Sequence, residues 1–202
     1  LGVLVKEEIC EKVVEVRRKN DRVMTVALVF EEEVMRVICG YGLQSGSGIT
    51  EKEQFFDEMA SEWDLHKVDE LVLGMGDFDG HVGKWIQGFE GVHGGSGIEE
   101  RNVEGRMLLA FCNEKELCVA TMWFRKTEKR KVTFSAKGNA TEIDFGLVGI
   151  INIKYLRDVK TRLGELQHSC RNELRRHWCQ AVSAFAFPLN NSGGVEREGW
   201  HA

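Results

Sequence analysis

Residues 70–83, ELVLGMGDFDGHVG, predict a buried strand that ends in a turn carrying two carboxylates and an imidazole. The first half is rich in Val and Leu, as buried strands are. The second half places Asp77, Asp79 and His81 among glycines, and in open α/β sheets reactive groups collect where strands end. Two acids one residue apart on such a turn can hold a divalent cation or manage a proton. The alternative is an ordinary surface turn, because Asp and Gly dominate turns.

The composition is that of an ordinary globular chain. Its 202 residues are 43% hydrophobic and 29% charged, which predicts one domain with a substantial core. No apolar stretch approaches the ~20 residues needed to span a bilayer, so no membrane partner is expected, and the cysteine usage predicts an intracellular protein, nuclear or cytoplasmic. The net charge of −5 speaks against a simple nucleic-acid binder, but less against a nuclease with a local basic patch. The six cysteines show no framework spacing, which predicts reduced, mostly buried thiols.

Alternating apolar residues in the first 41 positions predict three antiparallel strands joined by short charged turns. A Gly/Ser loop, YGLQSGSG, follows at 41–48, and Thr50 with Glu53 forms a capping-box pattern that predicts the start of a helix. Asn102 is a candidate cap for a second helix after a Gly-rich loop at 84–101. Further strands are predicted at 117–122, 132–135, 141–148 and 156–160. From Ser169 the pattern changes, and we expect a separate, partly disordered tail with a short helix near 172–186.

Six short motifs occur in an order and spacing more specific than any one of them. They are CGYGLQ at 39–44, GDFDGHVG at 76–83, Arg101-Asn102 before a helix, VTFS at 132–135, TEIDF at 141–145 and Gln167-His168. Over residues 1–168 the chain thereby resembles the endonuclease/exonuclease/phosphatase superfamily, and within it the endonuclease domains of non-LTR retrotransposons (LINE elements). Residues 169–202 match nothing in this pattern.

The resemblance implies an α+β, DNase I-like fold: a two-sheet β-sandwich flanked by helices, in four layers. It also implies hydrolysis of DNA phosphodiesters with Mg²⁺ or Mn²⁺. By this analogy Asp77 orients or deprotonates the attacking water and is a candidate metal ligand. Residue 79 hydrogen-bonds the scissile phosphate, and His168, oriented by Asp144, stabilises the transition state. The same analogy assigns phosphate or DNA contacts to four further positions: Tyr41, Gln44, Asn102 and Thr133.

The chain departs from the superfamily pattern in ways that predict weak or absent activity. Residue 79 is Asp where the pattern has Asn, so a hydrogen-bond donor is replaced by a charge that repels phosphate. The first strands of the pattern, with an Asn and the principal metal-binding Glu, would precede Leu1, and the chain does not begin with Met. We therefore expect an N-terminally truncated domain, and the alternative function is a non-catalytic remnant that binds DNA or a protein.

Several other interpretations of single motifs remain open. The DFDG sequence at 77–80 also resembles the nucleophile motif of haloacid-dehalogenase-type phosphatases, although that motif usually opens a parallel α/β chain. Asn102 can be a helix cap rather than a phosphate contact. Gly94–Gly97 is a plain loop rather than a phosphate cradle, because no Lys or Thr follows it as in a P-loop. A calcium loop at Asp77 is excluded, since its sixth position is Val82 instead of Gly.

Two clusters late in the chain suggest binding. Aromatic and basic residues gather at 123–131 and suit a nucleic-acid backbone, or form only a charged turn between strands. The tail contains two His-x-Cys pairs, His168 with Cys170 and His177 with Cys179. Together they could bind zinc, although their spacing fits no common zinc module.

Overall fold

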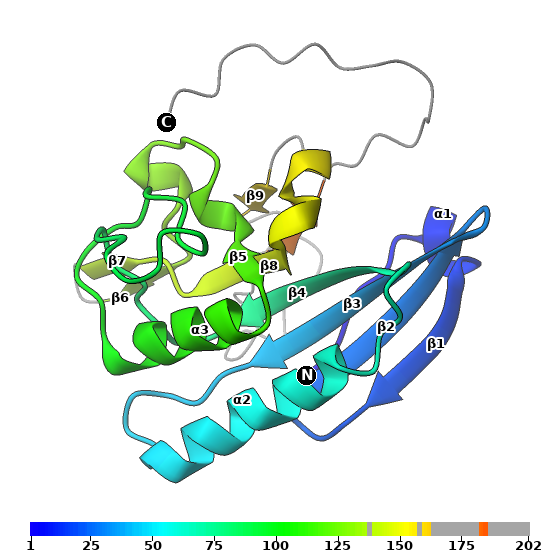
Figure 1. Cartoon of the computed structure of the whole chain (residues 1–202), viewed down its shortest axis with the longest axis horizontal. Coiled ribbons are helices and arrows are strands. Elements are labelled where there is room, and N and C mark those ends of the chain that lie inside the picture. The colour runs from blue at the N-terminus through cyan, green and yellow to red at the C-terminus, as the bar shows by residue number, and fades with distance from the viewer. Residues whose placement is uncertain (137–138, 157–158, 163–181, 186–202) are drawn as a thin grey trace.

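A six-stranded sheet forms the centre of the molecule in the computed structural model, which describes residues 1–136, 139–156, 159–162 and 182–185 (Figure 1). The strand order in this sheet is β1-β2-β3-β4-β8-β5. Its strands are β1 (Val13–Arg18), β2 (Val23–Phe30), β3 (Glu33–Tyr41), β4 (Leu71–Asp77), β5 (Leu117–Val119) and β8 (Asp144–Gly149). Two two-stranded sheets accompany it: β6 (Phe134–Ala136) with β7 (Asn139–Thr141), and β9 (Val159–Arg162) with β10 (Val182–Phe185).

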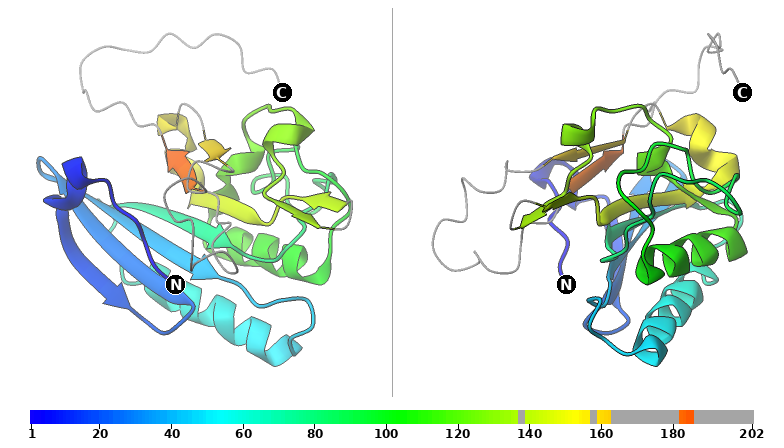
Figure 2. Two further views of the ribbon diagram at one scale, coloured as in Figure 1. Left: turned by 180° about the vertical axis from the view of Figure 1, so that it is seen from behind. Right: turned by 90° about the vertical axis from the view of Figure 1, so that its left-hand side faces the viewer.

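The helices are α1 (Glu7–Cys10), α2 (Ile49–Trp63) and α3 (Val103–Glu114), with 3-10 turns at Ala120–Met122, Glu128–Arg130 and Ile150–Tyr155. Helices α2 and α3 cover one side of the large sheet, and the N-terminal segment lies on the other side (Figure 2). The predicted α+β class, with a larger sheet, a smaller second sheet and flanking helices, is confirmed. No helix in the described part of the chain is long and apolar enough to cross a membrane.

The three predicted N-terminal strands are confirmed. β1 pairs with β2 and β2 with β3, both antiparallel, and Glu31 at the second connection has φ +57°. β3 and β4 are parallel, whereas β8 is antiparallel to both β4 and β5. This largely antiparallel sheet does not favour the haloacid-dehalogenase interpretation, which requires a parallel α/β arrangement.

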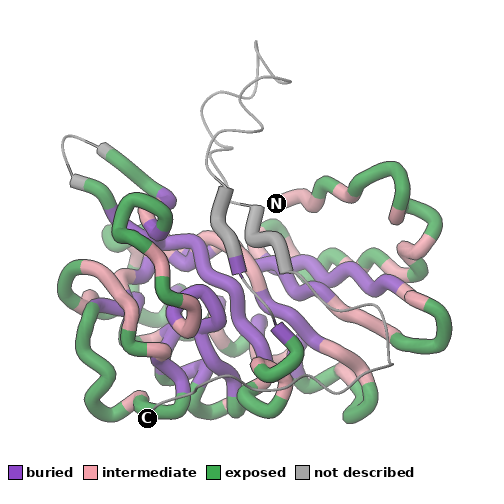
Figure 3. Tube along the Cα trace, turned by 90° about the horizontal axis from the view of Figure 1, so that it is seen from above, coloured by how far each residue is buried: buried purple, intermediate pink, exposed green. Residues whose placement is uncertain are grey.

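Apolar side chains pack on both faces of the sheet, and each of the strands β2, β3, β4 and β8 has a continuous buried stretch (Figure 3). On the helix side, Ile38, Leu147 and Phe145 pack with Met59 of α2 and Leu108 of α3. On the opposite side, the strand residues Met24, Val26, Leu28, Val37 and Cys39 pack with Leu1, Val3 and Ile9 of the N-terminal segment. Both helices therefore bury an apolar face against the sheet.

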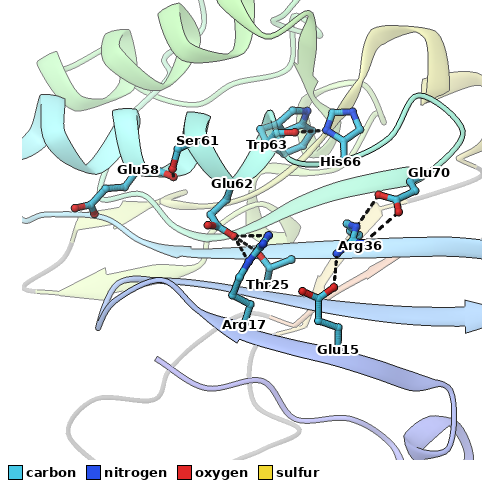
Figure 4. Close-up of polar contacts among 10 residues, drawn as sticks. All are labelled: Glu15, Arg17, Thr25, Arg36, Glu58, Ser61, Glu62, Trp63, His66 and Glu70. Atoms are coloured by element: carbon cyan, nitrogen blue, oxygen red, sulfur yellow. Dashed lines mark hydrogen bonds and ion pairs between the residues drawn. The ribbon is translucent and has the colours of Figure 1, made fainter.

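A buried carboxylate ties α2 to the first strands (Figure 4). Glu62 is 2% exposed, and its Oε2 accepts hydrogen bonds from Thr25 Oγ1 at 2.9 Å and Arg17 Nε at 3.0 Å. Arg36 of β3 links β1 to the start of β4, donating to Glu15 Oε2 at 2.7 Å and to Glu70 Oε2 at 2.6 Å. These contacts fix α2 and the strands β1 to β4, whose ends carry the candidate site residues.

Several predicted boundaries are wrong. Helix α2 begins at Ile49, with Gly48 as its N-cap and Glu51, not Glu53, accepting the hydrogen bond from the Gly48 amide at 3.2 Å. The strand predicted at 117–122 ends at Val119 because the chain turns into a 3-10 helix. The helix predicted near 172–186 is wrong at 182–185, which pairs with β9 as a strand; the rest of it lies outside the described residues.

The cysteines follow the prediction in part. Cys39, Cys112 and Cys118 are buried free thiols, whereas Cys10 is exposed. Burial raises the pKa of both Cys39 and Cys118 to about 12, so these two thiols stay protonated. The remaining two cysteines, and with them the zinc pattern of the tail, lie outside the described residues.

Candidate functional site

The strand register brings three of the predicted site residues into one row. Tyr41 ends β3 beside Asp77 at the end of β4, and Asp77 lies opposite Asp144 at the start of β8. Residues paired across neighbouring strands project from the same face of a sheet. This is the face opposite the helices: Leu73, four residues before Asp77, and Val148, four residues after Asp144, share it and pack in a cluster that contains no residue of α2 or α3. Tyr41, Asp77 and Asp144 therefore face the same space.

The turn after β4 is fixed by its own backbone. Phe78 is 2% exposed, inserts into the core against Phe55, and donates its amide to Ile143 O at 2.9 Å. Asp79 follows with φ +48°, a left-handed conformation that Asp and Asn adopt more readily than most residues. Its amide donates to Asp77 Oδ1 at 2.9 Å. The two carboxylates of the turn thus have different surroundings, one over the sheet and one over the neighbouring loop.

Asn102 joins this turn to helix α3. Its Oδ1 accepts hydrogen bonds from the amides of Gly105 and His81, both at 2.8 Å, and its Nδ2 donates to Asp79 O at 3.5 Å. The helix-cap interpretation is confirmed, and the same side chain also holds the turn. The approach is close: a Cβ added to Gly80 would lie 2.9 Å from the Gly105 amide nitrogen, so only a glycine fits there.

Asp79 also braces the Gly/Ser loop between β3 and α2. Its Oδ2 accepts the Ser45 amide at 2.8 Å. Lys52 of α2 donates to Ser45 O at 3.1 Å and to Glu104 Oε1 of α3 at 2.6 Å, and the Lys52–Glu104 pair is buried. The loop, both helices and the turn are therefore connected by one polar network.

Both carboxyls of the row have raised pKa values. Burial raises the pKa of Asp144 to about 7, and the neighbouring charge of Asp77 adds to this increase. A hydrogen bond with Thr133 acts in the opposite direction and lowers the pKa. Burial also raises the pKa of Asp77, although the Asp79 amide opposes the shift. Neighbouring carboxylates repel when both are ionised, so a cation or a shared proton would stabilise the pair.

Thr133 supports Asp144 from below the surface. It is 2% exposed, and its Oγ1 accepts the amides of Ile143 at 3.0 Å and Asp144 at 3.2 Å. The hydroxyl of Thr133 thus contacts the backbone at the start of β8, and its amide donates to Thr141 O of β7 at 2.8 Å.

The remaining predicted residues differ in their surroundings. Gln44 is exposed in the 42–48 loop. Tyr41 is half-buried, with the Arg22 guanidinium 5.3 Å from its ring centroid and donating to Tyr41 O at 3.2 Å. His168 lies outside the described residues, so its expected pairing with Asp144 stays a prediction.

The sequence interpretation did not identify Glu142. This side chain is 4% exposed, and its Oε2 has no hydrogen-bond partner among the described residues. Burial raises its pKa to about 8, against the charges of Lys131 and Lys126 and with that of Asp144. Its position two residues before Asp144 was the signal available, because alternate residues of an extended chain share a side.

Part of the predicted basic cluster is interior. Lys131 is 5% exposed and its Nζ donates to Ser96 O, so it belongs to the scaffold. Residues 128–130 form an exposed 3-10 turn, in agreement with the alternative of a charged connection. Within residues 1–136 and the shorter described segments, no group of three or more His, Cys, Asp or Glu is arranged to hold a metal ion.

Comparison with curated proteins gives one relevant relative. The chain is similar to craniofacial development protein 2. The Bos taurus protein is 23% identical over 137 residues, which cover 67% of this chain and 23% of that protein. The chain thus spans about a quarter of its curated relative's length. No protein-family model matches.

Three solved structures resemble the fold at low sequence identity. The endonuclease domain of TRAS1, a telomere-specific non-LTR retrotransposon, is 10% identical with a TM-score of 0.48, covering 69% of this chain and 56% of that one. The AP endonuclease LMAP from Leishmania major is 12% identical with a TM-score of 0.48, covering 72% and 51%. An endonuclease/exonuclease/phosphatase family protein from Leptotrichia buccalis C-1013-b is 12% identical with a TM-score of 0.41, covering 69% and 44%.

Proposed function

We propose that this chain is a retrotransposon-derived DNA endonuclease domain, acting on phosphodiesters with a divalent metal and with weak activity. The observation that carries the proposal is the row of Tyr41, Asp77 and Asp144 across three strands, beside a turn held in place by Asn102. Residues 41, 77 and 144 come from motifs up to about a hundred residues apart, and their pairing brings two carboxyls and a phenol together, groups that phosphodiester hydrolysis can use. DNA is the proposed partner, and the nucleus or cytoplasm the proposed location.

Each side chain of the row has a proposed role. Asp77, held by the Asp79 amide, would orient the attacking water and accept its proton, for which a raised pKa suits a general base. Tyr41 and Gln44 would contact phosphate oxygens from the loop side. Asp144 would fix the tautomer of His168, whose imidazolium would stabilise charge on the phosphate.

The residues of the row suit a hard divalent cation. Mg²⁺ is commonly held by only one or two carboxylates, with water and substrate phosphate completing its shell. Asp77 is the first candidate ligand, and Asp144 beside it is the second. When bound, Mg²⁺ or Mn²⁺ would polarise the phosphate and lower the pKa of the attacking water.

Weak activity follows from Asp79. Its Oδ2 already accepts the Ser45 amide, and a carboxylate has no hydrogen to donate to a phosphate oxygen. Its charge would also repel the scissile phosphate, and loss of one such donor lowers turnover by about a hundredfold or more.

Nicking of supercoiled plasmid tests this proposal. With Mg²⁺ we expect slow nicking that disappears in Asp77→Ala and in EDTA. Rapid cleavage that depends on Asp77 would contradict the proposed weakness, and slow cleavage unaffected by Asp77→Ala would contradict the proposed site.

The second candidate function is DNA binding without cleavage, because the carboxylate at position 79 lacks the hydrogen-bond donor that cleavage would use. Filter binding distinguishes the two: DNA affinity with a steep salt dependence and no metal-dependent nicking would support the binder. A protein-binding remnant would show neither property.

A further inference from the structure

The loop between β4 and α3 presents an exposed tryptophan that no part of the proposed chemistry uses. Trp85 is 66% exposed, the largest exposed fraction of any aromatic side chain in the described segments, and Ile86 beside it is 41% exposed. Single exposed apolar side chains are common on protein surfaces, so Trp85 indicates a ligand only together with its rigid loop and its cationic neighbours.

The loop that carries Trp85 is held from below. His93 is 2% exposed; its Nε2 donates to Gly83 O at 2.8 Å, and its Nδ1 accepts the Gly95 amide at 3.0 Å. Arg101 donates to Val82 O at 2.9 Å and to Trp85 O. The backbone of Trp85 is therefore fixed before any ligand arrives, which lowers the entropy lost on binding.

Cationic and acidic side chains both lie on the segments around this tryptophan: Lys84 lines one shallow pocket with Glu99 and Glu128, and Arg106 lines another. Lys84, which directly precedes Trp85, is exposed. Arg101, which donates a hydrogen bond to the Trp85 carbonyl, lines an open pocket with Arg106. Asn102 and Val103 complete the described lining of that pocket, and none of the four residues is acidic. Exposed aromatic and cationic groups together suit nucleic acid better than an apolar protein surface, because bases stack and phosphates pair with the cations.

The surface lies next to the candidate site. Trp85 is four residues beyond His81, so their Cα atoms are at most about 15 Å apart. Asn102, in the pocket lining, holds the His81 amide. That span is about four base steps of a duplex, so one DNA molecule can reach both places.

We propose that Trp85 stacks on an unpaired base of DNA bound at the 77–81 turn, with Lys84 and Arg106 contacting the flanking phosphates. This inference rests on the proposed DNA partner and extends it to a substrate class: duplexes with locally unpaired bases. In a regular duplex the faces of the bases are already stacked, so the tryptophan gains little there.

Equilibrium binding in EDTA tests the inference without requiring cleavage. The probes are a short fluorescein-labelled duplex and the same duplex with a few unpaired nucleotides. We expect Trp85→Ala to weaken binding of the second probe about tenfold and of the first hardly at all. Trp85→Phe should retain part of the preference. Arg106→Gln should weaken both probes equally and lower the salt slope by about one.

The matched control is Ile151→Ala, which removes an apolar side chain that is 73% exposed on the 3-10 helix at Ile150–Tyr155. It should leave both affinities unchanged. Equal affinity of Trp85→Ala and the unsubstituted protein for the unpaired probe, or equal losses on both probes, would overturn the stacking role. If Asp77-dependent nicking persists in that case, only this inference fails; if the protein binds neither probe, the DNA partner fails as well.

Discussion

Asp79 shows how one residue can be well placed for structure and badly placed for chemistry. Its left-handed backbone and its acceptor bond from the Ser45 amide shape the loop over the site. An asparagine would satisfy both demands, since Asn also adopts positive φ and its Oδ1 also accepts a hydrogen bond. The carboxylate differs only in its charge and in the donor it lacks.

Asp79→Asn should therefore increase activity without disturbing the fold. The added amide supplies a donor to phosphate and the repulsive charge is removed, so we expect Mg²⁺-dependent nicking to rise at least tenfold. The melting temperature should change little, because the Ser45 contact is retained. Asp79→Ala is the control, which removes the charge without adding a donor; an equal gain in both variants would show that the donor has no role.

Glu142 predicts a pH dependence of stability. Its pKa is about 8 in the folded state and near its ordinary 4.5 in the unfolded state, so the folded protein binds the extra proton between these values. The free energy of unfolding should therefore fall as pH rises through this window. Glu142→Gln mimics the protonated form and should be more stable than the unsubstituted protein at pH 8 by about 1 kcal/mol or more, with no gain at pH 4. Urea denaturation at the two pH values measures this, and a difference independent of pH would contradict it.

The sequence alone predicted on which elements several candidate residues of this site lie, but not how they are held. Asp77 and Asn102 follow local rules, a strand end and a helix cap, and both were placed correctly in the chain. The hydrogen bond from the Ser45 amide to Asp79 depends on a contact between distant segments, which no local pattern encodes, and the spacing of Glu142 from Asp144 does not by itself show that Glu142 is buried. The position of His168 relative to Asp144 stays a prediction.

At the scale of elements, α2 and α3 are joined by the buried Lys52–Glu104 pair, which also holds the Ser45 loop. Removing one partner leaves an unpaired buried charge. We expect Lys52→Met to lower the free energy of unfolding by about 3 kcal/mol. The double variant Lys52→Met with Glu104→Leu should recover most of that loss. Urea denaturation of the two single variants and the double variant completes a double-mutant cycle, and additive losses of unfolding free energy would show that the pair is not coupled.

The loop at 84–101 depends on a neutral His93. Burial lowers the pKa of this imidazole, and its Nδ1 must stay unprotonated to accept the Gly95 amide. Its contribution is complete above the unfolded pKa of about 6.5 and is lost as pH falls below it. Unfolding free energies between pH 7 and pH 5 should decrease more steeply for the unsubstituted protein than for His93→Gln. Parallel curves would contradict the assignment.

Elements with strong periodicity were predictable, and their ends were not. The first three strands and both long helices follow from apolar spacing. The start of α2 was misplaced because the backbone of the preceding loop, rather than the Thr50–Glu53 pattern, decides where the helix begins. The segment at 141–148 divides into β7 and β8, since Glu142 and Ile143 leave one sheet before the chain joins another.

At the scale of the whole molecule, the pairing of strands in the sheet brings residues that are distant in the sequence close together in space. One parallel and one antiparallel pairing place residues 41, 77 and 144 in a row, and the buried faces of the sheet fix that register, since a one-residue slip would reverse every side chain. The α+β class follows from the order of strands and helices, whereas the row itself follows only from the pairing of distant strands.

The most direct test of this account is the rate of Mg²⁺-dependent nicking of supercoiled plasmid by Asp79→Asn, compared with the same variant carrying Asp77→Ala. If the row beside the 77–81 turn is a DNA phosphodiester site, Asp79→Asn nicks the plasmid and the double variant does not. Equal rates in the two proteins, or no nicking by Asp79→Asn, would contradict it.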